Sequence, residues 1–138
     1  MEERMNQFKK VLEIINKTYD EDHFGIIYFT EVTLDQINEI KKQAPLFIED
    51  WDVSWNDAPT AYELIKFVES NPEFTFEGFV TIPEEREGEC RVTLTAVAAP
   101  ETDANIAALY SWINDDKNEF IEPGELNAYN GNIRAWWD

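Results

Sequence analysis

Residues 73–98 read EFTFEGFVTIPEEREGECRVTLTAVA, and this stretch decides the fold class. Its two apolar runs, 73–82 and 90–98, are rich in β-branched and aromatic residues, and a short acidic connection joins them. Two such runs with a short polar connection are typical of an antiparallel hairpin. Because glycine in a strand often marks a bulge, Gly78 predicts a bend in the first run.

The second run of this hairpin alternates between apolar and polar side chains from Cys90 to Ala96. Successive side chains of a strand point to opposite faces of the sheet. We therefore expect one face of this strand to be apolar and to point into a core. The residues assigned to that face are Cys90, Val92, Leu94 and Ala96.

Four amphipathic segments around the hairpin predict helices, because apolar residues recur in them at steps of three and four. These segments are 2–19, 34–44, 58–70 and 103–113. Thr33 and Gln36 have the spacing of a capping box at the start of the second helix. Asp57 is expected to cap the third helix, with Pro59 in its first turn.

Further strands are predicted on both sides of the hairpin. Residues 23–32 are apolar on both faces, which predicts a central strand. The turn signal Asn130-Gly131 precedes a predicted last strand over 132–137. A short strand is expected over 46–48. The order of elements predicts an α+β fold, with an antiparallel sheet of about four strands packed against helices in a single compact domain spanning 1–138.

Composition excludes several classes of protein. The chain has 138 residues and a formal net charge of −18. Binding to nucleic acid or to anionic lipid needs a basic surface, so neither direct interaction is expected. One cysteine and one histidine exclude the common zinc ligand sets. The charged first residues and the absence of an apolar run of about 20 residues predict a cytoplasmic protein with no membrane association.

The negative charge is concentrated in residues 46–138. Residues 1–45 carry nine acidic and six basic side chains, whereas residues 46–138 carry twenty acidic and five basic ones. The acidic clusters fall mostly in predicted connections between helices and strands. If these connections lie together, the protein presents an anionic face that would attract a basic partner.

Two acidic segments, 49–57 and 84–89, are the strongest candidates for contact with such a partner. Tryptophan is enriched at the centres of protein interfaces, so the two tryptophans of the first segment are candidate anchors. The predicted contact residues are Glu49, Asp50, Trp51, Asp52, Trp55, Asp57, Glu84, Glu85, Glu87 and Glu89.

These features predict a non-catalytic binding protein that docks on the basic, nucleic-acid-binding surface of another protein. Inhibitors, immunity proteins and anti-defence proteins that mimic nucleic acid act in this way. An acidic housekeeping domain without a specific partner is an alternative, since an acidic surface also keeps a protein soluble. Either a monomer or a homodimer is compatible with the sequence. No enzyme is predicted, because the chain lacks a phosphate-binding glycine loop and a nucleophile motif.

A second alternative comes from the loop 114–125, which resembles the calcium loop of EF-hand proteins. Alternate positions carry oxygen ligands, and a glutamate stands at the twelfth position, as six to eight oxygens around calcium require. Glu119 stands where the family has glycine, and only 125–129 remain for the exiting helix. The resemblance implies calcium as the one candidate cofactor. Its ligands would be Asn114, Asp116, Asn118, the Phe120 carbonyl, Glu122 and Glu125.

Overall fold

A five-stranded sheet forms the centre of the computed structural model, which describes residues 2–118, 120 and 122–137. The strands lie in the order β1-β2-β3-β5-β4, and all neighbours are antiparallel. Their bounds are Ile26–Val32 (β1), Thr75–Thr81 (β2), Val92–Pro100 (β3), Glu125–Tyr129 (β4) and Asn132–Trp136 (β5). The predicted α+β fold is confirmed, with five strands in the described chain instead of about four.

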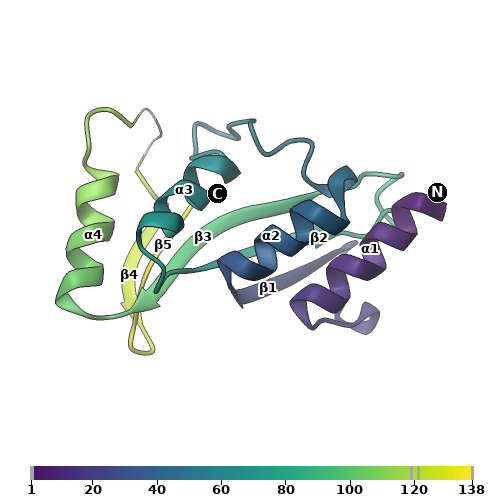
Figure 1. The fold of residues 1–138 in the computed structure, drawn as a ribbon, viewed down its shortest axis with the longest axis horizontal. Coiled ribbons are helices and arrows are strands. Elements are labelled where there is room, and N and C mark those ends of the chain that lie inside the picture. Colours follow the sequence, from purple (N-terminus) through teal and green to yellow (C-terminus); the bar gives the residue numbers. More distant parts are fainter. Residues whose placement is uncertain (1, 119, 121, 138) are drawn as a thin grey trace.

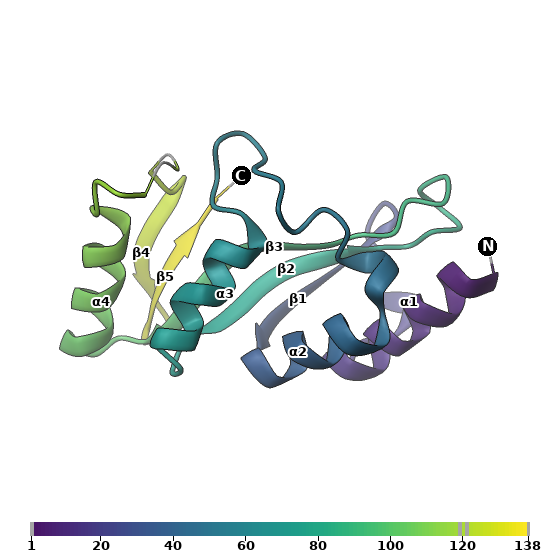
Figure 2. The ribbon, with the colours of Figure 1, turned by 45° about the horizontal axis from the view of Figure 1, so that its top comes forward.

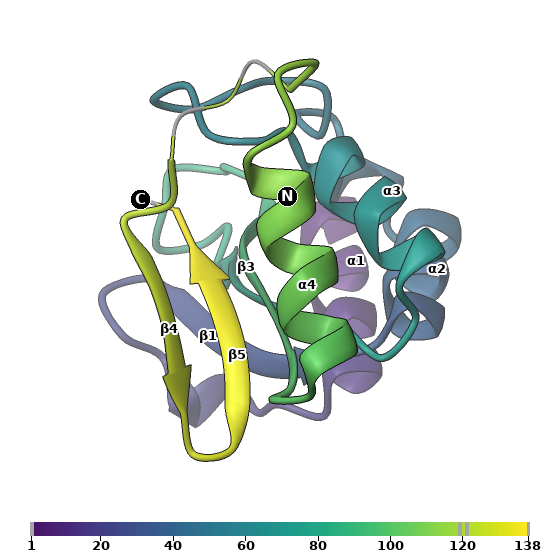
Figure 3. The ribbon, with the colours of Figure 1, turned by 90° about the vertical axis from the view of Figure 1, so that its left-hand side faces the viewer.

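Four α-helices of the described chain lie on one side of this sheet. Figure 1 shows α1, α2 and α3 along its length and α4 beside β4 and β5. Figures 2 and 3 show that the other face carries none of these helices. The helices span Glu2–Ile15 (α1), Leu34–Gln43 (α2), Ala61–Ser70 (α3) and Asp103–Ile113 (α4). None of them combines the length and the apolarity that crossing a bilayer requires.

The hydrophobic core lies between the helices and the sheet. Each helix buries one apolar stripe against the strands, which is how an amphipathic helix and a sheet stabilise each other. The fully buried residues of the helices include Phe8, Val11, Ile37, Ile40, Leu64, Val68 and Leu109. Those of the sheet include Ile27, Phe76, Val80 and Val97.

The bulge predicted at Gly78 is confirmed. Glu77 lies opposite Ala96, whereas Gly78 lies opposite Leu94, so Thr95 is an extra residue on β3. An extra residue bends a strand and increases its twist. The β2–β3 hairpin is therefore curved at its middle.

The extra residue also reverses the alternation of β3. Val92 and Leu94 belong to the core before it, and Val97 and Ala99 belong to the core after it. The prediction that Ala96 shares the face of Val92 and Leu94 is wrong, because a shift of one residue moves every later side chain to the opposite face.

Two α-helices of the described chain, α2 and α3, begin with capping boxes. Thr33 Oγ1 accepts a hydrogen bond from the Gln36 amide, and Gln36 Oε1 accepts one from the Thr33 amide, as predicted. The third helix is capped by Thr60 with Glu63, and the predicted cap at Asp57 is wrong. Asp57 has a φ of 60°, whereas an N-cap residue needs an extended backbone.

The predicted central position of the first strand is wrong, because β1 pairs with β2 alone. Tyr28 on its second apolar face is 54% exposed. Tyr28 therefore lies on the side of the sheet that no helix of the described chain covers, and no second buried layer forms there. Glu31 has a φ of 57°, and pairing is interrupted between Phe29 and Val32.

Three other boundaries differ from the sequence predictions. The first helix ends at Ile15, and Asn16 follows with a φ of 56°, a conformation that commonly terminates helices. Residues 45–47 form a 3-10 helix and not a strand, and this turn places Phe47 in the core. Residues 125–129 form β4 and not a helix.

The turn predicted at Asn130-Gly131 is confirmed. Both residues have positive φ angles, of 51° and 79°, and Tyr129 pairs with Asn132 across them. Two residues of this kind form the tight turn that matches the twist of a hairpin. The turn explains why the segment before it is a strand, since it returns the chain directly along β5.

We expect Gly78→Ala to lower the free energy of unfolding by about 3 kcal/mol, because an added Cβ would lie 1.9 Å from the Thr93 carbonyl oxygen. Gly131→Ala is the control. Its Cβ meets nothing within 4 Å, so only the backbone strain at a φ of 79° remains, at about 1 kcal/mol. Urea denaturation measures both, and a smaller loss for Gly78→Ala than for Gly131→Ala would contradict the close approach.

Candidate functional site

Arg91 brings the two predicted acidic segments together. Its Nε lies 3.1 Å from Asp50 Oδ2, and its Nη1 lies 3.4 Å from Glu89 Oε1. Its guanidinium also lies over the Trp55 ring, 4.8 Å from the centroid. Asp50 and Trp55 belong to 49–57 and Glu89 to the other segment, so one cation directly before β3 contacts both segments.

The two tryptophans of segment 49–57 have different environments. Trp51 is only 2% exposed, and its Nε1 donates a hydrogen bond to the Val92 carbonyl at 2.7 Å. Its prediction as an anchor for a partner is wrong in this structure, because its ring closes the edge of the core. Trp55 is 45% exposed, so its ring can be contacted from outside.

Most of the predicted acidic residues are at the surface. The exposed ones are Glu49, Asp52, Asp57, Glu84, Glu85 and Glu87. Asp50 and Glu89 are half-buried, in agreement with their contacts to Arg91. The structure therefore places the carboxylates where a partner could reach them.

A cluster of three carboxylates extends this surface beyond the predicted residues. Asp22 directly follows the 3-10 helix Tyr19–Glu21 and lies beside Glu84 and Glu85 of the β2–β3 connection. A hydrogen bond shared with Asp22 raises the pKa of Glu85, and slight burial and the charges of Asp22 and Glu84 raise it further. Burial raises the pKa of the Tyr19 hydroxyl, and the same three charges add to that shift.

Sequence reasoning missed Asp22 because it is distant from the β2–β3 connection along the chain. The two segments meet because the Ile82 amide donates a hydrogen bond to the Gly25 carbonyl at 2.8 Å, just beyond β1 and β2. Asp22 Oδ1 accepts a hydrogen bond from the Gly25 amide at 2.7 Å, which fixes its carboxylate. Only the pairing of β1 with β2 could have indicated this contact.

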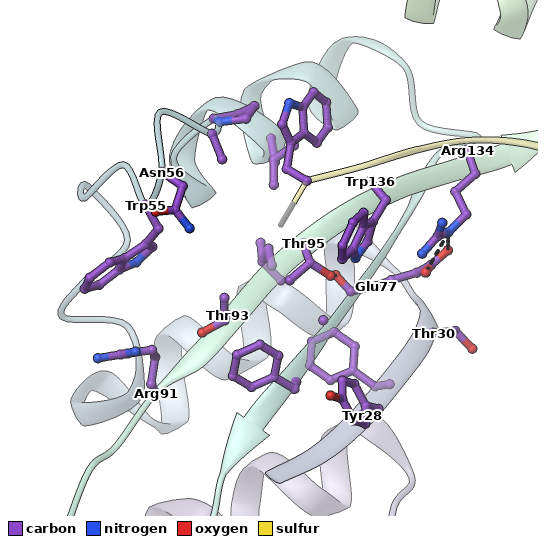
Figure 4. Close-up of a pocket in the computed structure, with 18 residues that line it drawn as sticks. Tyr28, Thr30, Trp55, Asn56, Glu77, Arg91, Thr93, Thr95, Arg134 and Trp136 are labelled. Carbon is purple, nitrogen blue, oxygen red and sulfur yellow. Dashed lines mark hydrogen bonds and ion pairs between the residues drawn. The ribbon is translucent and has the colours of Figure 1, made fainter. Parts of the chain in front are cut away.

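A hollow of about 460 Å³ borders the face of the sheet that carries no helix, and its lining also includes Ala58 and Pro59, just before α3, and Leu64 of α3. Figure 4 shows Trp55 and Asn56 on one side of it and Trp136 and Arg134 on the other. A second hollow, of about 950 Å³, continues along the same face and shares Thr30, Glu77 and Arg134. The aromatic and polar residues of the first hollow, here called the open-face cleft, include Tyr28, Trp55, Glu77, Phe79, Arg91, Thr93, Thr95, Arg134 and Trp136.

Arg134 crosses this face and connects three strands. Its Nε lies 3.0 and 2.9 Å from the two Glu77 carboxylate oxygens, and its Nη1 lies 2.7 Å from Glu125 Oε2. Ala98 lies opposite Arg134 on β3, and Ala96 lies opposite Glu77. Because both alanines are small, the arginine side chain can reach across β3 to β2.

The loop 114–125 has the calcium-like spacing but a different course from an EF-hand. Its last residue, Glu125, begins β4 and binds Arg134, so a strand stands where an exiting helix would be. Asn118 Nδ2 donates to the Trp112 carbonyl at 2.7 Å. Glu119 and Ile121 lie outside the described residues. Calcium binding by this loop stays a prediction.

The other proposed calcium ligands are spread along this loop. Asn114, Asp116 and Glu122 are exposed, and the Phe120 ring packs on Trp112 at 4.9 Å between centroids. Within residues 2–118, 120 and 122–137, no group of three histidine, cysteine, aspartate or glutamate side chains is arranged to hold a metal ion.

We expect Arg134→Met to lower the free energy of unfolding by about 2 kcal/mol, because it leaves a largely buried Glu77 carboxylate unpaired. The Arg134 and Glu77 side chains are 23% and 17% exposed. Lys17→Met is the control, since its pair with Glu21 is on the surface and should cost less than about 0.5 kcal/mol. Thermal denaturation compares the two variants, and equal losses would refute a structural role of the Arg134 network.

No family model, no curated protein and no solved structure matches this chain.

Proposed function

We propose that this protein is a non-catalytic binding module that docks on a basic surface of another protein through segments 49–57 and 84–89. The class of partner that fits best is a nucleic-acid-binding protein, whose basic cleft an acidic, rigid protein can occupy in place of nucleic acid. The function is then that of an inhibitor, an immunity protein or an anti-defence protein. The net charge of −18 favours rapid, electrostatically guided association.

The observation that carries this proposal is the gathering of Asp22, Glu84 and Glu85 at one end of the sheet. The ion pairs found among the described residues give none of the three a cation. The hydrogen bond shared with Asp22 is the main cause of the raised pKa of Glu85, and the charges of Asp22 and Glu84 raise it further, so full ionisation of the cluster is disfavoured. A lysine or arginine from a partner would favour the ionised form of all three carboxylates.

Trp55 supports the same surface. Its ring is nearly half exposed, yet Arg91 holds it from one side, and Arg91 is itself held by Asp50 and Glu89. A ring that is exposed but already ordered loses little conformational freedom on binding. We assign the Trp55 side chain the role of an apolar contact among the carboxylates of segments 49–57 and 84–89.

The test of docking compares two double variants that change the net charge equally. Glu84→Lys/Glu85→Lys alters the proposed surface, and Glu13→Lys/Glu39→Lys alters exposed positions on α1 and α2. Each is titrated, by calorimetry at about 0.1 M and about 1 M salt, against a panel of purified nucleases with basic clefts. We expect a nuclease that binds the wild type at low salt, with an affinity that falls about tenfold or more in the first variant only.

Equal losses in the two double variants would show that bulk charge, and not this surface, attracts the partner. Binding that is as tight at high salt as at low salt would contradict the electrostatic basis. Failure of every nuclease in the panel to bind would contradict the proposed class of partner.

The carboxylate cluster also predicts a pH dependence. The pKa of Glu85 is higher in the folded state than in the unfolded state, so ionisation above that pKa lowers stability. Glu85→Gln should therefore raise the melting temperature at pH 7 and low salt, and the difference should vanish as the pH falls below the pKa of Glu85. Glu49→Gln, another exposed glutamate, is the control. A stabilisation by Glu85→Gln that persists in acid would contradict the repulsion.

A further inference from the structure

The open-face cleft has the size and the lining of a site for a small molecule. Its volume of about 460 Å³ falls in the range of ligand pockets, which are mostly apolar with a few polar groups. It shares Trp55, Asn56 and Arg91 with the docking surface, and Ala58 and Pro59, just before α3, and Leu64 of α3 also line it. Most of its other lining residues lie on β1, β2, β3 and β5. Neither Glu84 nor Glu85 lines the cleft, so its ligand can be tested separately from docking.

Aromatic rings on several strands border the cleft. Tyr28 on β1 and Phe79 on β2 are paired residues whose rings meet edge to face, with centroids 6.0 Å apart. Trp136 on β5 borders the same cleft, and Trp55 stands at its rim (Figure 4). Aromatic rings favour offset or edge-to-face contact with another ring, so they suit a planar ligand.

The charged side chains of the cleft select against a charged ligand. Glu77 and Arg134 are paired with each other, and Arg91 is paired with Asp50 and Glu89. The strong negative charge of the whole protein repels anions as well. A neutral ligand would leave all these pairs intact.

Thr93, which lines the cleft, has a hydroxyl group without a hydrogen-bond partner among the described residues. Thr93 Oγ1 is buried and forms no hydrogen bond with any residue that the structure describes. Its neighbours differ: Thr95 Oγ1 lies 3.4 Å from the Glu77 carbonyl oxygen, and Thr81 Oγ1 lies 2.9 Å from the Glu89 carbonyl oxygen. Buried polar atoms in native proteins are nearly always satisfied, so each exception needs an explanation.

We propose that the open-face cleft binds a small, uncharged, planar ring compound whose hydroxyl or carbonyl group forms a hydrogen bond with Thr93 Oγ1. The rings of Tyr28, Phe79 and Trp136 contact the faces and edges of the ligand. The paired arginines close the ends of the cleft without taking part in the bond.

The test uses p-cresol as the probe, with three compounds that each lack one property. Toluene lacks the hydrogen-bonding group, 4-methylcyclohexanol lacks the planar ring, and 4-methylbenzoate carries a charge. Each is titrated into the ¹⁵N-labelled protein, and amide shifts are followed by NMR. We expect p-cresol to shift the Gly78, Thr93 and Trp136 signals and to bind more tightly than the other three.

Two threonine variants test the hydrogen bond. Thr93→Val should weaken p-cresol binding about fivefold, the contribution of one neutral hydrogen bond, and leave toluene binding unchanged. It should also raise the melting temperature of the free protein, because it removes an unpartnered buried hydroxyl. The control is Thr95→Val, because the Thr95 hydroxyl has a partner in the free protein. This variant should neither weaken p-cresol binding nor raise the melting temperature. Tyr28→Ala should weaken the binding of both p-cresol and toluene. Because Tyr28 is exposed, the fold should tolerate this substitution.

Three outcomes would overturn the proposal: no p-cresol shifts in the cleft up to the solubility limit, equal binding of p-cresol by wild type and Thr93→Val, or tighter binding of 4-methylbenzoate. A tyrosine-containing peptide that shifts these signals where p-cresol does not would also overturn it, in favour of a protein side chain as the occupant. The Glu84→Lys/Glu85→Lys variant should bind p-cresol normally, so failure of this proposal and failure of the docking proposal are separately visible.

Discussion

The close approach of Gly78 to the Thr93 carbonyl is the constraint on which the rest of this fold depends. It allows one extra residue, Thr95, on β3, and that residue changes which face each later side chain occupies. Val92 and Val97, at positions of opposite parity, can thereby reach the same core. Without the bulge, one half of the longest strand would turn its apolar residues away from the helices.

The same bulge determines the chemistry of the uncovered face. Ala96 and Ala98 lie there with only methyl groups, and Arg134 passes over them to Glu77. The sheet is thus held together on one face by apolar burial and on the other by an ion-pair network. These two faces differ in what they can bind: the helical face is closed by its core, and the uncovered face offers rings, hydroxyl groups and paired charges.

Local signals in the sequence predicted much of the fold. The β2–β3 hairpin, the Thr33 capping box and the Asn130-Gly131 turn were predictable because each depends on residues that are close in the chain. Segment 125–129 was not, since its short length fits a helical turn or a strand and only pairing with β5 decides between them. Periodicity likewise gave the two apolar faces of β1 but not its position at the edge of the sheet.

The candidate sites show the same limit. The acidic segments were visible as composition, but Trp51 and Trp55 lie four residues apart in one acidic stretch and differ in exposure. The Trp51 ring packs into the core and donates to the Val92 carbonyl on β3, whereas the Trp55 ring lies at the surface beside Arg91. The contact of Asp22 with Glu84 and Glu85, and the unpartnered hydroxyl of Thr93, depend on strand pairing between distant segments. Sequence patterns report which side chains are available, and tertiary structure decides which of them meet.

The strand order has a consequence for the folding of the chain. β3 pairs on one side with β2, which precedes it, and on the other with β5, which the ribosome makes only after α4 and β4. During synthesis the hydrogen-bonding groups along that edge of β3 stay unpaired until Asn132–Trp136 emerge, and an unpaired edge is where chains aggregate or exchange strands. The high density of negative charge then acts before the native state exists, since like-charged nascent chains repel one another while this edge is open.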